Sequence, residues 1–90
     1  MPERTRYHHV SSAFVSALPG NLEAVRAQLA TMPDVEIHGC ERNRIIVVIE
    51  GSSAGDVGDR LAAISVMEGV VAANLVFEHI EREEVTNHDR

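Results

Sequence analysis

Five consecutive β-branched residues, Ile45-Ile46-Val47-Val48-Ile49, constrain the fold of this chain more than any other segment. Such residues lose side-chain freedom in a helix but pack well on a pleated sheet, so the run predicts a strand, which we place at Arg44 to Glu50. A strand that is apolar on both faces is contacted from both sides. The segment therefore predicts a strand in the middle of a sheet.

Three further segments alternate between apolar and other residues with the period of two that is typical of a strand. They run from Val10 to Leu18, from Asp34 to Gly39 and from Val70 to Glu78. The second of them precedes the central run, and the polar residues from Cys40 to Asn43 are expected to form the turn of a β-hairpin. The chain thus contains four predicted strands.

Two segments between these strands have the spacing of amphipathic helices. The first follows Pro19-Gly20-Asn21, where the Asn21 side chain is expected to cap the helix, and ends at Pro33. The second runs from about Asp56 to Val66. Their apolar stripes consist of Leu22, Val25, Leu29 and Met32, and of Val57, Leu61, Ile64 and Met67.

The order of these elements predicts an α+β chain with a ferredoxin-like βαββαβ fold. A chain of 90 residues buries only about 60% of its unfolded surface, so one sheet with one helical layer is about all it can build. Right-handed connections give an antiparallel sheet with strand order 4-1-3-2 and both helices on one face. We expect residues 1–80 to form this single domain, and the acidic tail 81–90 to be disordered.

The sheet surface without helices, here called the open face, is the predicted site of function. Alternation places Phe14, Ile46, Val48 and Val76 at its centre, with Ser12 and Asn74 beside them and Glu36, Glu50 and Glu78 around them. An exposed apolar patch with a polar border usually marks a partner site. On the last strand, the helix-covered side is expected to carry Val71, Ala73, Leu75 and Phe77.

Composition argues against several classes of partner and location. The chain has 14 acidic residues against 8 basic ones, a net charge of -6, and 3% aromatic residues. It therefore repels nucleic acid and lacks a platform for stacking bases. Cys40 is the single cysteine, which fits a reducing compartment. The longest apolar run is far below the roughly 20 residues of a membrane span, and the N-terminus has no signal-peptide pattern, so we expect a cytoplasmic protein.

No residue pattern predicts catalysis or metal binding. The histidines have no cysteine or carboxylate at zinc-site spacing, and surface positions explain them better. Glu36 and Glu50 are the nearest approach to a carboxylate pair, but no second functional group accompanies them. The loop Gly51 to Gly55 lacks the residues of a phosphate-binding loop. We therefore expect a protein that is not an enzyme and has neither a metal nor a cofactor.

Four segments resemble the NapD family, and the resemblance covers about residues 8 to 79. The first is Val10-Ser11-Ser12, and the more specific ones are Met32-Pro33-Asp34-Val35-Glu36-Ile37, the central run with Glu50, and the segment from Met67 to Phe77. Two residues depart from the family's pattern, because Asp34 replaces the commoner Gly and Phe77 the commoner Tyr. Neither change affects a catalytic group, since the family has none.

The resemblance implies a cytoplasmic chaperone; its oligomeric state does not follow from the sequence, and a monomer is our expectation. Its partner would be the twin-arginine signal peptide of the catalytic subunit of periplasmic nitrate reductase, whose export it holds back until the molybdenum cofactor is inserted. Such a peptide carries two arginines beside an apolar stretch, which complements the open face with its glutamates. The alternative is a small-molecule regulatory domain of the ACT type, for which the loop Leu18-Pro19-Gly20-Asn21 is a weak signal.

Overall fold

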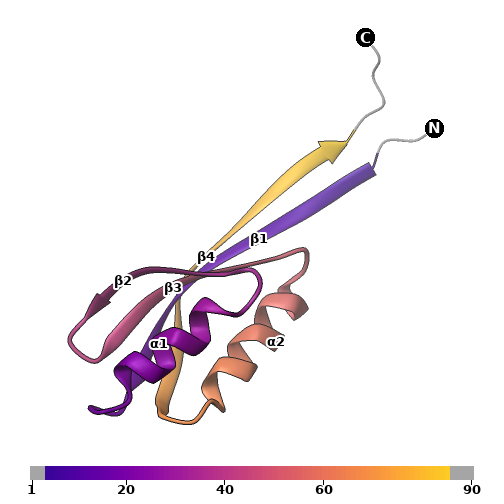
Figure 1. Ribbon diagram of the computed structural model, residues 1–90. Coiled ribbons are helices and arrows are strands. Elements are labelled where there is room, and N and C mark those ends of the chain that lie inside the picture. The colour runs from indigo at the N-terminus through magenta and orange to yellow at the C-terminus, as the bar shows by residue number, and fades with distance from the viewer. Residues whose placement is uncertain (1–3, 86–90) are drawn as a thin grey trace.

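The computed structural model describes the backbone of residues 4–85 and the side chains of residues 8–80. In chain order the elements are β1 (Arg4–Ala17), α1 (Leu22–Ala30), β2 (Val35–Glu41), β3 (Arg44–Gly51), α2 (Ala54–Ser65) and β4 (Val70–Val85). The strands form one antiparallel sheet in the order β2-β3-β1-β4, and both helices lie on one side of it (Figure 1). The predicted ferredoxin-like fold is confirmed, including its strand order, which is the same order read from the opposite edge.

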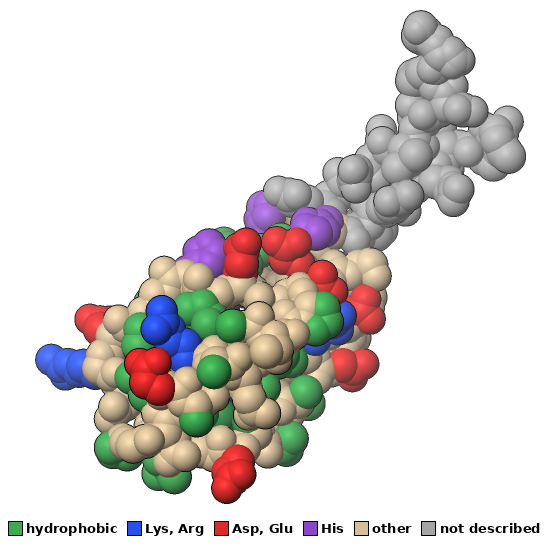
Figure 2. All heavy atoms as spheres, viewed as in Figure 1, with side chains coloured by type: hydrophobic (Ala, Val, Ile, Leu, Met, Phe, Trp, Pro, Cys, Tyr) green, Lys and Arg blue, Asp and Glu red, His purple; other side chains and the backbone are tan. Residues whose placement is uncertain are grey.

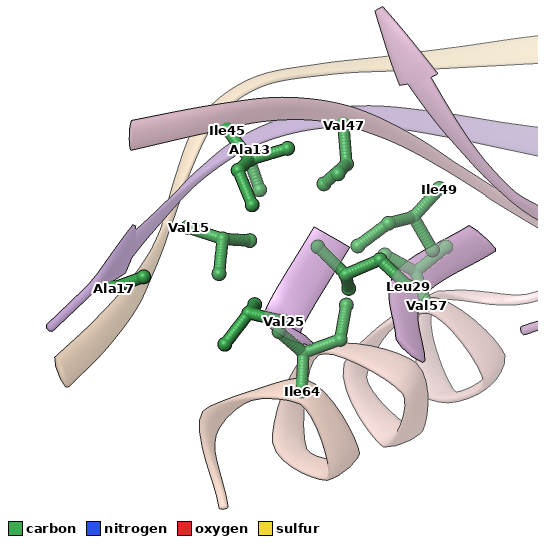
Figure 3. Packing of buried hydrophobic residues seen from close by; sticks show 10 residues of the cluster. All are labelled: Ala13, Val15, Ala17, Val25, Leu29, Ile45, Val47, Ile49, Val57 and Ile64. Atoms are coloured by element: carbon green, nitrogen blue, oxygen red, sulfur yellow. The ribbon is translucent and has the colours of Figure 1, made fainter. Parts of the chain in front are cut away.

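The core lies between the sheet and the two helices. Alternate residues of the central strands point toward the helices, whose apolar stripes meet them from below (Figure 3). The buried apolar residues are Ala13, Val15, Ala17, Val25, Leu29, Ile45, Val47, Ile49, Val57 and Ile64. Within β3, Ile46 and Val48 alternate with the buried residues and are only partly buried, so the strand uses one face for the core and leaves the other available.

Helix α2 begins earlier than predicted because Ser53 caps it. The Ser53 hydroxyl accepts a hydrogen bond from the Asp56 N–H at 3.1 Å, which satisfies one of the free amides of the first turn. The Asp56 carboxylate accepts bonds from the Ser52 hydroxyl at 2.8 Å and from the Ser52 N–H at 3.2 Å. These bonds, that of the hydroxyl first, hold the pKa of Asp56 below its ordinary value. At α1, by contrast, the expected side-chain cap does not form, because the Asn21 side chain makes no capping hydrogen bond.

Strands β1 and β4 are longer than the sequence pattern predicts. They pair from Ala17 and Val70 as far as Arg4 and Val85, and beyond the layered part of the molecule they continue as a two-stranded ribbon (Figure 1). The strand assignment through Val85 contradicts the disorder expected at 81–85. Residues 86–90, the rest of the predicted tail, lie outside the described residues.

The hairpin between β2 and β3 is tighter than expected. Strand β2 includes Cys40 and Glu41, which the sequence pattern assigns to the turn, and the connection is reduced to Arg42 and Asn43. Arg42 has a φ of 59°, in the left-handed region that such short connections require. The longer strand brings Glu41 directly opposite Arg44.

Gly69, which precedes β4, is expected to be the glycine least tolerant of a side chain. Its φ is 90°, and an added Cβ would lie 2.8 Å from the Cβ of Asn21. We expect Gly69→Ala to lower the free energy of unfolding by about 1–3 kcal/mol in urea denaturation. Gly58→Ala is the matched control, because Gly58 is helical and has open space around it. That change should raise stability by about 0.5–1 kcal/mol, and equal effects of the two changes would contradict the prediction.

Candidate functional site

The open face is built from rows of residues that pair across the sheet. Because directly opposite residues of antiparallel strands share a face, the registers show which side chains lie together. Two rows cross the middle of the open face, one formed by Glu36, Val48 and Ser12 and the other by Ile46, Phe14 and Asn74. The structure therefore brings these six predicted site residues together.

The centre of the open face is apolar and partly accessible. Phe14, Ile46 and Val48 are partly buried, whereas their chain neighbours Ala13, Val15, Ile45, Val47 and Ile49 are fully buried on the helix-covered side. Phe14 and Ile46 are direct partners, and Val48 is two residues from Ile46 along β3. Three apolar side chains from two central strands thus form a continuous surface.

An extra residue in β4 changes what that strand presents to the open face. Leu75 pairs with Ala13 and Phe77 pairs with Ser12, so Val76 between them has no partner, and 56% of its surface is exposed. One extra residue reverses the alternation beyond it. Phe77 therefore lies on the open face, where it is 60% exposed, and its predicted position facing the helices is wrong.

The same extra residue moves Glu78 away from the predicted site. Glu78 pairs with Ser11, which is fully buried on the helix-covered side of β1. The prediction that Glu78 borders the open face is therefore wrong. His79, opposite Val10, takes the open-face position instead. The period of two in the sequence gives no sign of the irregularity, because every residue from Leu75 to Phe77 is apolar.

A second irregularity near the start of β4 exposes another residue. Val70 pairs with Ala17 and Ala72 with Ser16, so Val71 is unpaired and largely exposed. The prediction that Val71 faces the helices is wrong, and Val70 packs against the core instead. Ala73 and Leu75, opposite buried Val15 and Ala13, do lie on the helix-covered side as predicted. In the described part of the chain, β4 carries five of the seven exposed large hydrophobic side chains, namely Val71, Leu75, Val76, Phe77 and Ile80.

Acidic residues line a hollow beside the apolar centre. The hollow has a volume of about 250 Å³ and is lined by Asp34, Val35, Glu36, Val48 and Glu50. Asp34 is already neutralised, because the Arg60 guanidinium lies 2.8 Å from its carboxylate. Asp34 also has a φ of 65°, in the left-handed region that glycine adopts most easily. Glu36 and Glu50 remain as the carboxylates that can attract a cation.

Each of these two carboxylates has a histidine beside it. The Nε2 atom of His38 lies 2.9 Å from an oxygen of Glu36, and that of His8 lies 3.4 Å from an oxygen of Glu50. Both glutamates remain accessible, with 73% and 45% of their side-chain surfaces exposed. Histidine and acidic side chains also lie next to each other on the molecular surface where the long ribbon begins (Figure 2). A stronger cation can replace a histidine at such a site, since neither carboxylate is enclosed.

One basic side chain lies within the open face. The guanidinium carbon of Arg44 is 4.7 Å from the centre of the Phe14 ring, which is the geometry of a cation–π interaction. Arg44 precedes the buried Ile45 on β3 and so lies on the same face as Ile46, but it is not among the predicted site residues, because spacing cannot show which ring a flexible side chain covers. The open face thus combines an apolar centre, two carboxylates and an aromatic ring that holds a guanidinium.

This arrangement suits binding of a segment that is partly apolar and partly cationic. In the described part of the chain, no cluster of three or more histidine, cysteine or acidic residues could hold a metal ion. The same part of the chain contains no helix with the length and apolar character of a membrane span.

Known proteins share both the sequence and the fold. The sequence profile of the NapD protein family matches residues 8–82. Chaperone NapD from Paracoccus pantotrophus is 45% identical over 76 residues, which are 84% of this chain and 68% of the relative. The solution structure of the E. coli Tat proofreading chaperone protein NapD matches with a TM-score of 0.73 and 25% identity, over 78% of this chain and 76% of that one. A chaperone role is not enzymatic, which agrees with the prediction that the chain is not an enzyme. The chain belongs to the NapD family.

Proposed function

We propose that this chain is a chaperone for the twin-arginine signal peptide of the catalytic subunit of periplasmic nitrate reductase, and that it delays export until the molybdenum cofactor is inserted. It acts in the cytoplasm as a monomer and needs no cofactor of its own. The names of its relatives, one of them a Tat proofreading chaperone, support this role. Family membership leaves the ACT-type alternative without support.

The observation that carries the proposal is the apolar centre of the open face beside two accessible carboxylates. In this proposal Phe14, Ile46, Val48 and Val76 contact the apolar part of the peptide, and Ser12 and Asn74 lie within the same surface. Glu36 and Glu50 attract the arginines of the peptide. Glu78 takes no part, because its pairing with Ser11 directs it to the other side of the sheet.

The test is a calorimetric titration with a synthetic twin-arginine signal peptide of the nitrate reductase. A second peptide, in which both arginines are replaced by lysine, is the control for recognition of arginine rather than of charge alone. We expect the arginine peptide to bind and the lysine peptide to bind more weakly, because guanidinium groups stack and form paired hydrogen bonds that ammonium groups cannot. Absence of binding by the arginine peptide would refute the proposed function.

Reversal of the charge at Glu36 is expected to slow association of the peptide. Glu36→Arg should lower the association rate about tenfold at low salt, because exposed border charges act over a screening length of roughly 10 Å at 0.1 M salt. The effect should shrink as salt is raised, which stopped-flow measurements can follow. Glu23→Arg on α1 is the matched control, since it makes the same charge change at an exposed position of a helix. If the two variants behave alike, Glu36 does not border the site.

A further inference from the structure

The stacked pair of Arg44 and Phe14 lies in the middle of the surface proposed to bind the peptide. Arg44 is the direct partner of Ser16, and Phe14 is two residues from Ser16 on the same face of β1. The guanidinium reaches back along this diagonal to the Phe14 ring, 4.7 Å from its centre. A cation of the chain itself therefore occupies the ring that a peptide arginine would meet.

We infer that Phe14 is the residue that selects arginine, and that Arg44 holds its ring until a peptide arginine takes its place. This inference rests on the proposed function and adds to it a specificity residue and a competing group. An aromatic ring binds a guanidinium through its face, and one ring face accommodates one guanidinium. Arg44 and a peptide arginine therefore compete for the same position.

Arg44 can leave the ring at little cost. Its side chain is exposed, and none of the ion pairs in the described part of the chain involves it. Glu41 lies directly opposite Arg44 across the hairpin, so a carboxylate on the same face is within reach of the displaced guanidinium. Displacement then exchanges one favourable contact of Arg44 for another.

The carboxylates explain only part of a preference for arginine, namely the part that comes from paired hydrogen bonds to a guanidinium. Glu36 and Glu50 are exposed and attract lysine and arginine through the same long-range field. A ring discriminates between them, because the planar and weakly hydrated guanidinium stacks on it better than the strongly hydrated ammonium does. Discrimination between the arginine and lysine peptides should therefore depend on Phe14, while overall attraction depends on the glutamates.

The test measures affinities of both peptides for the parent chain, Arg44→Gln, Phe14→Leu and the double variant. Arg44→Gln should raise the affinity for the arginine peptide about two- to fivefold, and less for the lysine peptide. Measurements at high salt suppress the part of this gain that comes from removing a like charge. In the Phe14→Leu background, Arg44→Gln should raise both affinities equally, because no ring remains to compete for.

Phe77→Leu is the matched control. Phe77 is the only other phenylalanine of the chain and lies on the same face, but no side chain among residues 8–80 makes a cation–π contact with its ring. Phe77→Leu should weaken the binding of both peptides equally and preserve the preference for arginine, whereas Phe14→Leu should reduce that preference. Phe14→Tyr keeps a ring and should keep the preference, and circular dichroism checks the fold of each variant.

The outcomes separate the two claims. A parent chain that binds neither peptide overturns both the proposed function and this inference. The inference alone is overturned if the parent chain prefers the arginine peptide and Phe14→Leu leaves that preference unchanged. It is also overturned if Phe77→Leu reduces the preference as much as Phe14→Leu does. Side-chain NMR of Arg44 gives a direct check, since its Nε–H resonance should lose the shift caused by the ring when the arginine peptide is added.

Discussion

Val48→Asp is expected to weaken binding of the signal peptide by about 30- to 150-fold, at low and at high salt alike. Val48 lies in the middle of the open face, between Glu36 on β2 and Ser12 on β1. A carboxylate there must lose its water when the apolar part of the peptide covers it, and this cost of about 2–3 kcal/mol is not screened by salt. Calorimetric titration at two salt concentrations measures the effect.

The control for Val48→Asp places the same charge elsewhere. Ala27→Asp adds an aspartate to an exposed position of α1 on the opposite side of the sheet, and it should leave binding unchanged. Because Val48 belongs to a central strand, circular dichroism must show that the variant is folded. Should folded Val48→Asp and Glu36→Arg chains both bind like the parent, the open face is not the site, and the exposed apolar edge of β4 becomes the better candidate.

The fold could be predicted from the sequence because its signals are repeated and local. The run from Ile45 to Ile49 has the composition of a strand, and the stripes containing Val25, Leu29, Val57 and Ile64 have the spacing of helices that cover one face. Burial confirms these signals for Ile45, Val47 and Ile49 and for the four helical residues, whereas Ile46 and Val48 face the other side of the sheet and are only partly buried. Element ends were harder to place, because the extension of β1 and β4 depends on their pairing with each other rather than on apolar spacing.

The candidate site was predictable only where alternation is unbroken. On β1 and β3, and on β2 as far as the irregularity at His38, the residues expected on the open face, such as Phe14, Glu36 and Val48, do lie there. On β4 the unpaired Val76 reverses the alternation, so Phe77 and Glu78 each appear on the face opposite to the predicted one. Whether a bulge forms depends on how the two strands pair. A run of apolar residues fits the register with the extra residue as well as the register without it.

Ionic and aromatic contacts were beyond sequence reasoning for a different reason. The approach of Arg44 to Phe14 and that of His8 to Glu50 depend on side-chain torsions and on neighbours across strands. Sequence spacing gives the face on which such residues lie, but it does not give their contacts. The structure adds these contacts, and they show that the cationic and acidic groups of the open face already have partners within the chain.

Leu29→Ala is expected to lower the free energy of unfolding by about 2–5 kcal/mol, a large share of the roughly 5–15 kcal/mol typical of a small domain. Leu29 is fully buried and lies near Ile49 and Val57 where α1 meets the sheet and α2 (Figure 3). Alanine favours helix, so the loss would come from packing and the cavity rather than from the helix itself. Urea denaturation followed by circular dichroism measures it.

The control for Leu29→Ala is a second substitution in α1, and a further measurement with the signal peptide tests whether the variant still binds. Gln28→Ala changes an exposed neighbour in α1 and should alter stability by less than about 0.5 kcal/mol. Because Leu29 faces away from the open face, its variant should keep the binding site, and peptide at about 100 times Kd should restore about 2.7 kcal/mol. Val48→Asp should gain less than about 1 kcal/mol from the same peptide concentration, because its weaker binding leaves the site only partly filled. If Leu29→Ala is as stable as Gln28→Ala, α1 does not pack on the sheet as described. If the peptide stabilises the parent chain but not the folded Leu29→Ala chain, the core and the open face are not independent.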